Sequence, residues 1–212
     1  MTPQRAYRHK LIEEFRSVLN LQPRWSNFTD GIVVLDYFED RHGTDFKTLV
    51  LNPENLSRID CAVRIYYAIA LEKYAKQKKD LTTKDLESTP LLPTFFLNAL
   101  RDALPILKEY TQRQGIPEKQ IAFMDNGKLN QGNTKTQCEI VCSNPNLRHV
   151  VLVSQSYHVP RLKRTVAAVF PEDMGYKIIG VPLSDMPYNV YRKVRGEIKR
   201  IIAYSAKGDI AR

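Results

Sequence analysis

An apolar run that ends abruptly in polar residues constrains the fold of this chain more than any other feature. Residues 149–161 read HVVLVSQSYHVPR, with four consecutive apolar residues, three of them valine. That composition is typical of a strand buried on both faces of a parallel sheet. Pro160 is tolerated in the first turn of a helix, and helical apolar spacing follows it. Ser154, His158 and Arg161 are therefore expected at the carboxyl end of a central strand, where open α/β sheets bind ligands.

Strands and helices are predicted to alternate along the rest of the chain. Core strands are expected at residues 31–35, 121–124 and 176–181, with a short strand at 48–51. Helices are expected at residues 57–79, with Ser57 as N-cap, and at 93–114, 132–143 and 188–206. This alternation predicts a Rossmann-like α/β fold, with a doubly wound, mainly parallel sheet and helices on both faces. We expect one domain over residues 1–212, with an N-terminal amphipathic helix at 3–21 and a loop or insertion at 80–94.

Bulk composition restricts the function without identifying it. No run approaches the roughly 18 apolar residues of a membrane span, and the N-terminus lacks a signal-peptide pattern, so a cytoplasmic protein is expected without integral membrane association. The net charge of +9, from 32 basic and 23 acidic residues, permits an anionic ligand or surface. No metal site is predicted, because cysteines and histidines lack ligand spacing at positions 9, 42, 61, 138, 142 and 149.

A second polar segment, Asp125 to Thr134, also follows a predicted strand and opens a helix. Gly127 and Gly132 have the glycine spacing of a phosphate-binding P-loop, but Asn133 stands where that loop needs lysine, which argues against a nucleoside triphosphatase. A glycine-bearing turn into a helix still offers backbone N–H groups and a positive dipole end to an anion. Asn133 and Thr134 are therefore either ligand-binding residues or simple caps of the helix.

The order of these segments resembles the YdcF-like family. The resemblance covers Gly115-Ile116-Pro117, Ile121, Asp125 and Gly132-Asn133-Thr134, followed by Val153-Ser154 and Tyr157-His158-Val159-Pro160-Arg161, and it is specific between residues 115 and 170. It implies a Rossmann-like fold with a pocket at the carboxyl edge of the sheet. It also implies a nucleotide-like ligand such as S-adenosylmethionine, or a phosphorylated envelope lipid. The chain departs from the family in having Asp36-Tyr37 where the first strand usually ends in glycines, and in lacking a Ser-Gly-Gly turn after the second strand.

Each candidate residue has a functional and a structural interpretation. His158 is a candidate general acid or base, although a lone histidine is more often a structural hydrogen-bonding group. Arg161 has a guanidinium fork that suits a phosphate or carboxylate, and its alternative is a surface salt bridge. Ser154 is expected to donate a hydrogen bond to a ligand or cap. Asp125 and, with less support, Asp36 are expected to orient a hydroxyl or a base, or else to be exposed turn carboxylates.

Two classes of function remain open. The first is an enzyme or binding protein for an anionic small molecule held by Gly132, Asn133, Thr134, Ser154, Arg161 and Asp36. The second is a basic interaction module that binds nucleic acid or an anionic surface through one of two lysine- and arginine-rich helices. A solvated helix face commonly explains such basic runs, and no nucleic-acid-binding signature supports the second class.

Overall fold

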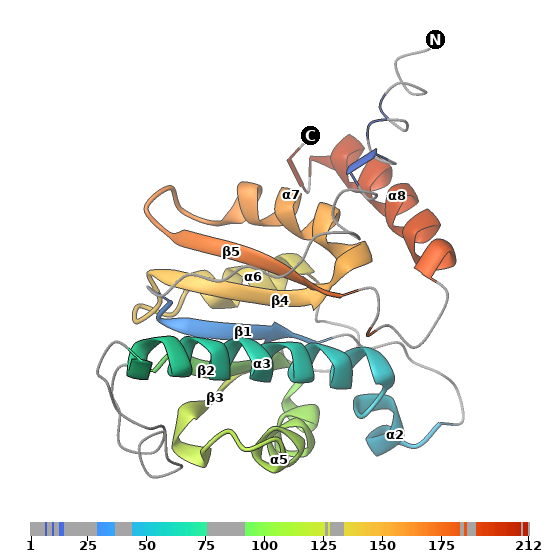
Figure 1. The fold of residues 1–212 in the computed structure, drawn as a ribbon. Helices are drawn as coiled ribbons and strands as arrows, with labels where there is room; N and C mark the ends of the chain where they lie inside the picture. The colour runs from blue at the N-terminus through green and yellow to red at the C-terminus, as the bar shows by residue number, and fades with distance from the viewer. Residues whose placement is uncertain are drawn as a thin grey trace.

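Five parallel strands form one sheet at the centre of the computed structural model (Figure 1). The order is β3-β2-β1-β4-β5, with β1 at Gly31–Leu35, β2 at Thr94–Ala99, β3 at Ile121–Asp125, β4 at His149–Gln155 and β5 at Gly175–Val181. The structure describes residues 7, 10, 13–14, 29–36, 44–75, 92–125, 127, 134–182, 185, 190–208 and 210–211. The predicted fold, a Rossmann-like α/β sheet with helices on both faces, is confirmed.

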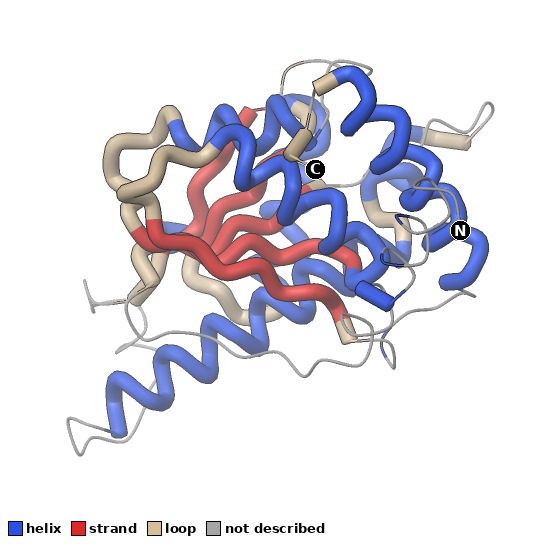
Figure 2. The backbone as a smooth tube through the Cα atoms, turned by 90° about the horizontal axis from the view of Figure 1, so that it is seen from above, coloured by secondary structure: helices blue, strands red, loops and turns tan. Residues whose placement is uncertain are grey.

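Helices cover both faces of the sheet (Figure 2). On one face, α3 (Pro53–Ala75) and α5 (Leu104–Arg113) share a core with Ile32, Val34 and Val153. On the other face, α6 (Thr134–Cys142) and α7 (Val159–Val169) pack against Val33, Leu35 and Leu152. The two central strands β1 and β4 are therefore buried on both sides, as their unbroken apolar sequences predict.

The helix α8 (Val190–Lys207) packs outside these two layers, against α7 and the short segment η3 (Ser156–His158) that follows β4 (Figure 1). A third apolar cluster joins its residues Ile198 and Ile201 to Tyr157 and Ile210. Tyr157 belongs to η3, the short 3-10 helix that connects β4 to α7. The terminal helix therefore borders the edge of the sheet at which the sequence places its candidate site.

The predicted helix at 93–114 is wrong in its first part, because Thr94–Ala99 is the strand β2 between β1 and β3. Six residues, TFFLNA, form this strand, and five of them are buried. A short apolar run of this kind fits a buried strand and a buried helix equally well. The helical part begins only after η1 (Arg101–Ala103), at Leu104, with Pro105 in its first turn. The predicted loop at 80–94 also ends too late, and its residues 80–91 lie outside the described part of the chain.

The predicted strand at 48–51 is wrong as well. Residues Phe46–Val50 form the short helix α2, whose first turn is capped by Asp45, which accepts a hydrogen bond from the Thr48 backbone N–H at 3.1 Å. The long helix α3 begins at Pro53 rather than at Ser57. Asn52 supplies its cap by accepting a hydrogen bond from the Asn55 backbone N–H at 3.0 Å. An Asn-Pro pair is a stronger helix-start signal than the serine further along.

Two smaller expectations, the N-terminal helix and the absence of a membrane span, are met only within the described residues. Tyr7, Lys10, Glu13 and Glu14 are helical, and the remainder of the predicted helix at 3–21 lies outside the described residues. All three cysteines are free thiols. Among the helices that the structure describes, none combines the length and the apolar character needed to cross a membrane.

Candidate functional site

The candidate site lies at the carboxyl ends of β1 and β4, where the strand order reverses. From β1 the sheet continues through β2 to β3 on one side, and through β4 to β5 on the other. The helix after β1, α3, covers one face, whereas the helix after β4, α7, covers the opposite face. The connections that follow β1 and β4 therefore run to opposite faces of the sheet. Such a topological switch point is where doubly wound sheets bind ligands.

Four of the predicted site residues form one continuous hydrogen-bonded chain. The Ser154 hydroxyl lies 2.8 Å from Nδ1 of His158, and the Thr134 hydroxyl lies 3.2 Å from Nε2 of the same ring. Arg161 donates from Nη1 to the Thr134 hydroxyl at 2.9 Å. These hydrogen bonds connect β4, η3, α6 and α7. They bring Thr134 together with residues 20 to 27 positions further along the sequence, at one edge of the sheet.

The imidazole of His158 is held in its neutral form. Burial lowers its pKa well below the ordinary value, and the positive charges of Arg161, Arg58 and Arg200 lower it further. A neutral imidazole has one donor and one acceptor nitrogen. One of its two hydroxyl neighbours therefore donates to the ring and the other accepts from it. This arrangement gives His158 a fixed orientation, and it leaves the ring in the form that can accept a proton.

Arg161 has a partner that the sequence analysis did not name. Its Nε donates to Oε2 of Glu197 at 2.6 Å, and its Nη2 donates to Oε1 at 3.3 Å. The Glu197 carboxylate also accepts from Nη1 of Arg200 at 2.7 Å. The Arg161 and Glu197 side chains are 16% and 2% exposed, so the pair is not the solvated surface salt bridge considered as the alternative. All three guanidinium nitrogens of Arg161 are hydrogen-bonded.

A second charged cluster lies beside the first, between α3 and α8. The carboxylate of Glu54 accepts from the Tyr157 hydroxyl and lies 2.9 Å from Nζ of Lys193. Arg58, which is fully buried, lies 3.8 Å from Glu54 and donates to the carbonyl of Leu35, the last residue of β1. This cluster fixes the end of β1 and η3 to α3 and α8, so both sides of the switch point are held by buried polar contacts.

The remaining site residues are distributed less compactly. Thr134 begins the nine-residue helix α6, but Gly132 and Asn133, which precede it, lie outside the described residues. Asp36 follows β1 directly, and its backbone carbonyl accepts from Nε2 of Gln137 at 3.2 Å. It is therefore at the expected edge, next to β4.

Asp125 does not lie beside His158. It ends β3, which is separated from β4 by two strands, or about 14 Å at the usual strand spacing. Its carboxylate accepts from Nε of Arg101 at 2.6 Å and from the Gly127 backbone N–H at 2.8 Å. Ser154, and not Asp125, is the group that orients the His158 ring. Asp125 therefore does not orient His158, and its contacts fit the exposed turn carboxylate that was the alternative expectation.

Two acidic residues that complete the site, Glu54 and Glu197, were not predicted from the sequence. A signal for Glu197 is present in the sequence, because it is the single acidic residue among the 18 of α8 and stands four positions before the buried Ile201. An acidic side chain on the apolar face of an otherwise basic helix indicates a buried cationic partner.

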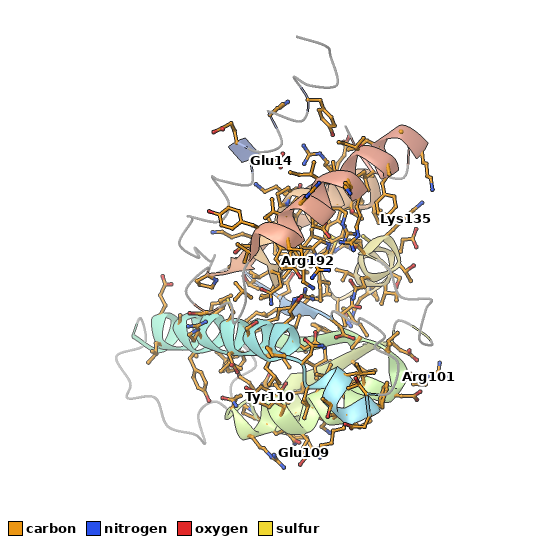
Figure 3. The ribbon with its side chains drawn as sticks, turned by 90° about the vertical axis from the view of Figure 1, so that its right-hand side faces the viewer. Glu14, Arg101, Glu109, Tyr110, Lys135 and Arg192 are labelled. Carbon is orange, nitrogen blue, oxygen red and sulfur yellow. The ribbon has the colours of Figure 1, made fainter. Side chains whose placement is uncertain are left out.

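The described residues contain no group of three or more histidine, cysteine, aspartate or glutamate side chains suited to a metal ion. What the site offers is a neutral imidazole, two hydroxyls, the N-terminus of α6 and arginine side chains (Figure 3 views this edge). These groups suit hydrogen bonding to an anion and proton transfer at His158. No protein-family model, no curated protein and no solved structure matches this chain.

Proposed function

We propose that this chain is a YdcF-like protein that binds an anionic small molecule at the switch point between β1 and β4. The observation that supports the proposal most strongly is the convergence of Thr134, His158 and Arg161 within hydrogen-bond distance at the carboxyl end of β4. A phosphate on a nucleotide-like ligand suits this position, because the first turn of α6 presents backbone N–H groups there. S-adenosylmethionine is the alternative ligand that the family resemblance suggests.

His158 is the residue we assign to proton transfer, if the bound ligand is transformed. Its ring is neutral, buried and oriented by Ser154 on one side and by the Thr134 hydroxyl on the other. A general base has to lie within hydrogen-bond reach of the group that it deprotonates. The hydroxyl of Thr134 meets this condition, and it also connects the ring to Arg161.

Calorimetric titration with nucleotides, sugar phosphates and S-adenosylmethionine tests the proposal. The best ligand should bind Thr134→Val about fivefold or more weakly than the wild type, since losing a buried hydrogen bond costs about 1 kcal/mol. Thr111→Val is the matched control, because Thr111 is also buried but its hydroxyl bonds to the Leu107 carbonyl within α5. Equally strong binding by both variants would show that the anion does not bind at this site.

A second candidate function is the binding of nucleic acid by the outer face of α8. Arg192, Arg195 and Lys199 lie at spacings of three and four residues, are exposed, and have no acidic partner within the described part of the chain. Figure 3 shows Arg192 on this helix. Arbitrary DNA would then bind with an affinity that falls steeply with salt, because phosphate contacts release counterions. Saturable binding of one phosphorylated metabolite favours the first candidate instead.

A further inference from the structure

The inward face of α8 carries two opposite charges one helical turn apart, Lys193 and Glu197. Residues at this spacing lie side by side on a helix and can pair with each other. Here each pairs instead with a residue of another helix: Lys193 with Glu54 of α3 at 2.9 Å, and Glu197 with Arg161 of α7 at 2.6 Å. Two ion pairs of opposite polarity thus connect α8 to the two sides of the switch point.

The contact with Glu197 restricts what Arg161 can bind. Nε and Nη2, the edge of the guanidinium that forms two parallel bonds to an oxyanion, are both occupied by the Glu197 carboxylate. Nη1 donates to Thr134. An incoming anionic group therefore reaches this edge of Arg161 only if it replaces the Glu197 carboxylate.

We propose that Glu197 is a specificity-determining residue, an internal anion that a ligand phosphate displaces from Arg161. The inference rests on the proposed function, because it requires an anionic ligand at this site. Exchange of one carboxylate for another leaves the charge beside Arg161 unchanged and gains little. A phosphomonoester carries close to two negative charges at neutral pH, so it competes better than a carboxylate or a phosphodiester.

Arg200 makes the displacement feasible. It already donates to Oε1 of Glu197 at 2.7 Å, it lies three residues further along α8, and its side chain is half exposed. When a phosphate takes Arg161, the Glu197 carboxylate retains Arg200 as a partner on its own helix. The displaced carboxylate is thus not left as an unpaired buried charge, which would oppose binding strongly.

The experiment is calorimetric titration of inorganic phosphate and adenosine monophosphate into the wild type and Glu197→Gln. Removal of the competing charge should tighten the binding of both probes about tenfold or more. The double variant Arg161→Gln/Glu197→Gln removes both charges of the pair together. It should therefore not show the tighter binding of the probes that is expected for Glu197→Gln. Glu197→Asp keeps the charge but is one methylene shorter, and should show a smaller gain; it also serves as the test if Glu197→Gln does not fold.

Glu172→Gln is the control for net charge, because Glu172 is exposed in the turn before β5. It should bind both probes as the wild type does, and an equal gain in this variant would overturn the inference. Equal affinities in the wild type and Glu197→Gln, with binding weakened by Thr134→Val, would overturn the role of Glu197 and leave the proposed function standing. Absence of binding to every protein and probe would overturn both.

Discussion

His158 connects the two hydroxyls of the site, and its protonation is opposed by burial and by three arginine side chains. This environment has a consequence for stability. The unfolded chain binds a proton on this imidazole at about pH 6.5, whereas the folded chain resists protonation until a lower pH. The stabilisation is therefore complete above about pH 6.5 and decreases as the pH falls below it.

We predict that the free energy of unfolding decreases as the pH falls through about 6.5, through His158, with a slope that approaches about 1.4 kcal/mol per pH unit near about pH 5.5. Chemical denaturation between about pH 7.5 and about pH 5.5 measures this slope, over a range in which most carboxylates stay ionised. His158→Gln should reduce the slope, because it removes the buried imidazole whose protonation is opposed. A slope that is unchanged in His158→Gln would show that the imidazole is not held neutral.

Arg161→Ala is predicted to destabilise the fold. The substitution leaves the carboxylate of Glu197 buried with only the half-exposed Arg200 as a partner. Removal of one member of a buried ion pair costs about 3–5 kcal/mol when the other is left unpaired, and because Arg200 stays bonded to Glu197 the loss should fall below that range. Arg113→Ala is the control, because Arg113 pairs with Glu109 on an exposed helix surface and should change stability little. Urea denaturation compares the two, and equal small effects would contradict the buried-pair description.

The four residues of the hydrogen-bonded chain were predictable because their positions follow from two simple rules. Parallel strands end at one edge of a sheet, and polar residues that follow two such strands meet there. Glu197 was not predictable by these rules, since it comes from a helix outside the two layers. Asp125 met the same rules as Ser154, but the strand order puts two strands, β2 and β1, between β3 and β4, and strand order is not encoded in any local pattern.

At the level of elements, the strands with flanking turns were predictable and β2 was not. β1, β3, β4 and β5 each follow a turn or a polar segment, so their limits were found within one or two residues. The buried sequence of β2 leads through three residues of η1 into α5, and its apolar positions continue those of the helix. The family's Ser-Gly-Gly turn would follow β2. In this chain β2 ends at Ala99, and Leu100 and Arg101 follow it in place of that turn.

Two glycines in these elements should respond to alanine in opposite ways. At Gly180, on β5, an added Cβ would lie 2.8 Å from the Ser156 Cα, so β5 and η3 would have to separate. At Gly196, inside α8, the nearest atom is Nη1 of Arg200 at 3.8 Å, so alanine fits. Gly196→Ala should therefore raise the free energy of unfolding by about 0.5–1 kcal/mol, and Gly180→Ala should lower it. Thermal denaturation measures both, and destabilisation by Gly196→Ala would contradict the packing of α8.

The molecule carries a formal net charge of +9, and its cationic side chains have different surroundings in different regions. Near the switch point the cations Arg58, Arg161 and Lys193 each face a buried carboxylate. On the outer face of α8 the cations face solvent. A small anion at the switch point and a polyanion on α8 would therefore depend on different residues, although both would be attracted by the same overall charge.

This difference allows the two candidate functions to be separated by one variant, in which Arg192, Arg195 and Lys199 are all replaced by glutamine. The substitutions lower the formal net charge from +9 to +6. These three side chains are exposed, and salt screens exposed charges, so their loss should change phosphate binding at the switch point less than about twofold. Binding of arbitrary DNA, measured by fluorescence polarisation, should fall together with its salt dependence. If the triple variant loses phosphate binding as completely as Thr134→Val loses it, the anion is held by the outer face of α8, and the basic interaction surface becomes the better description of the molecule.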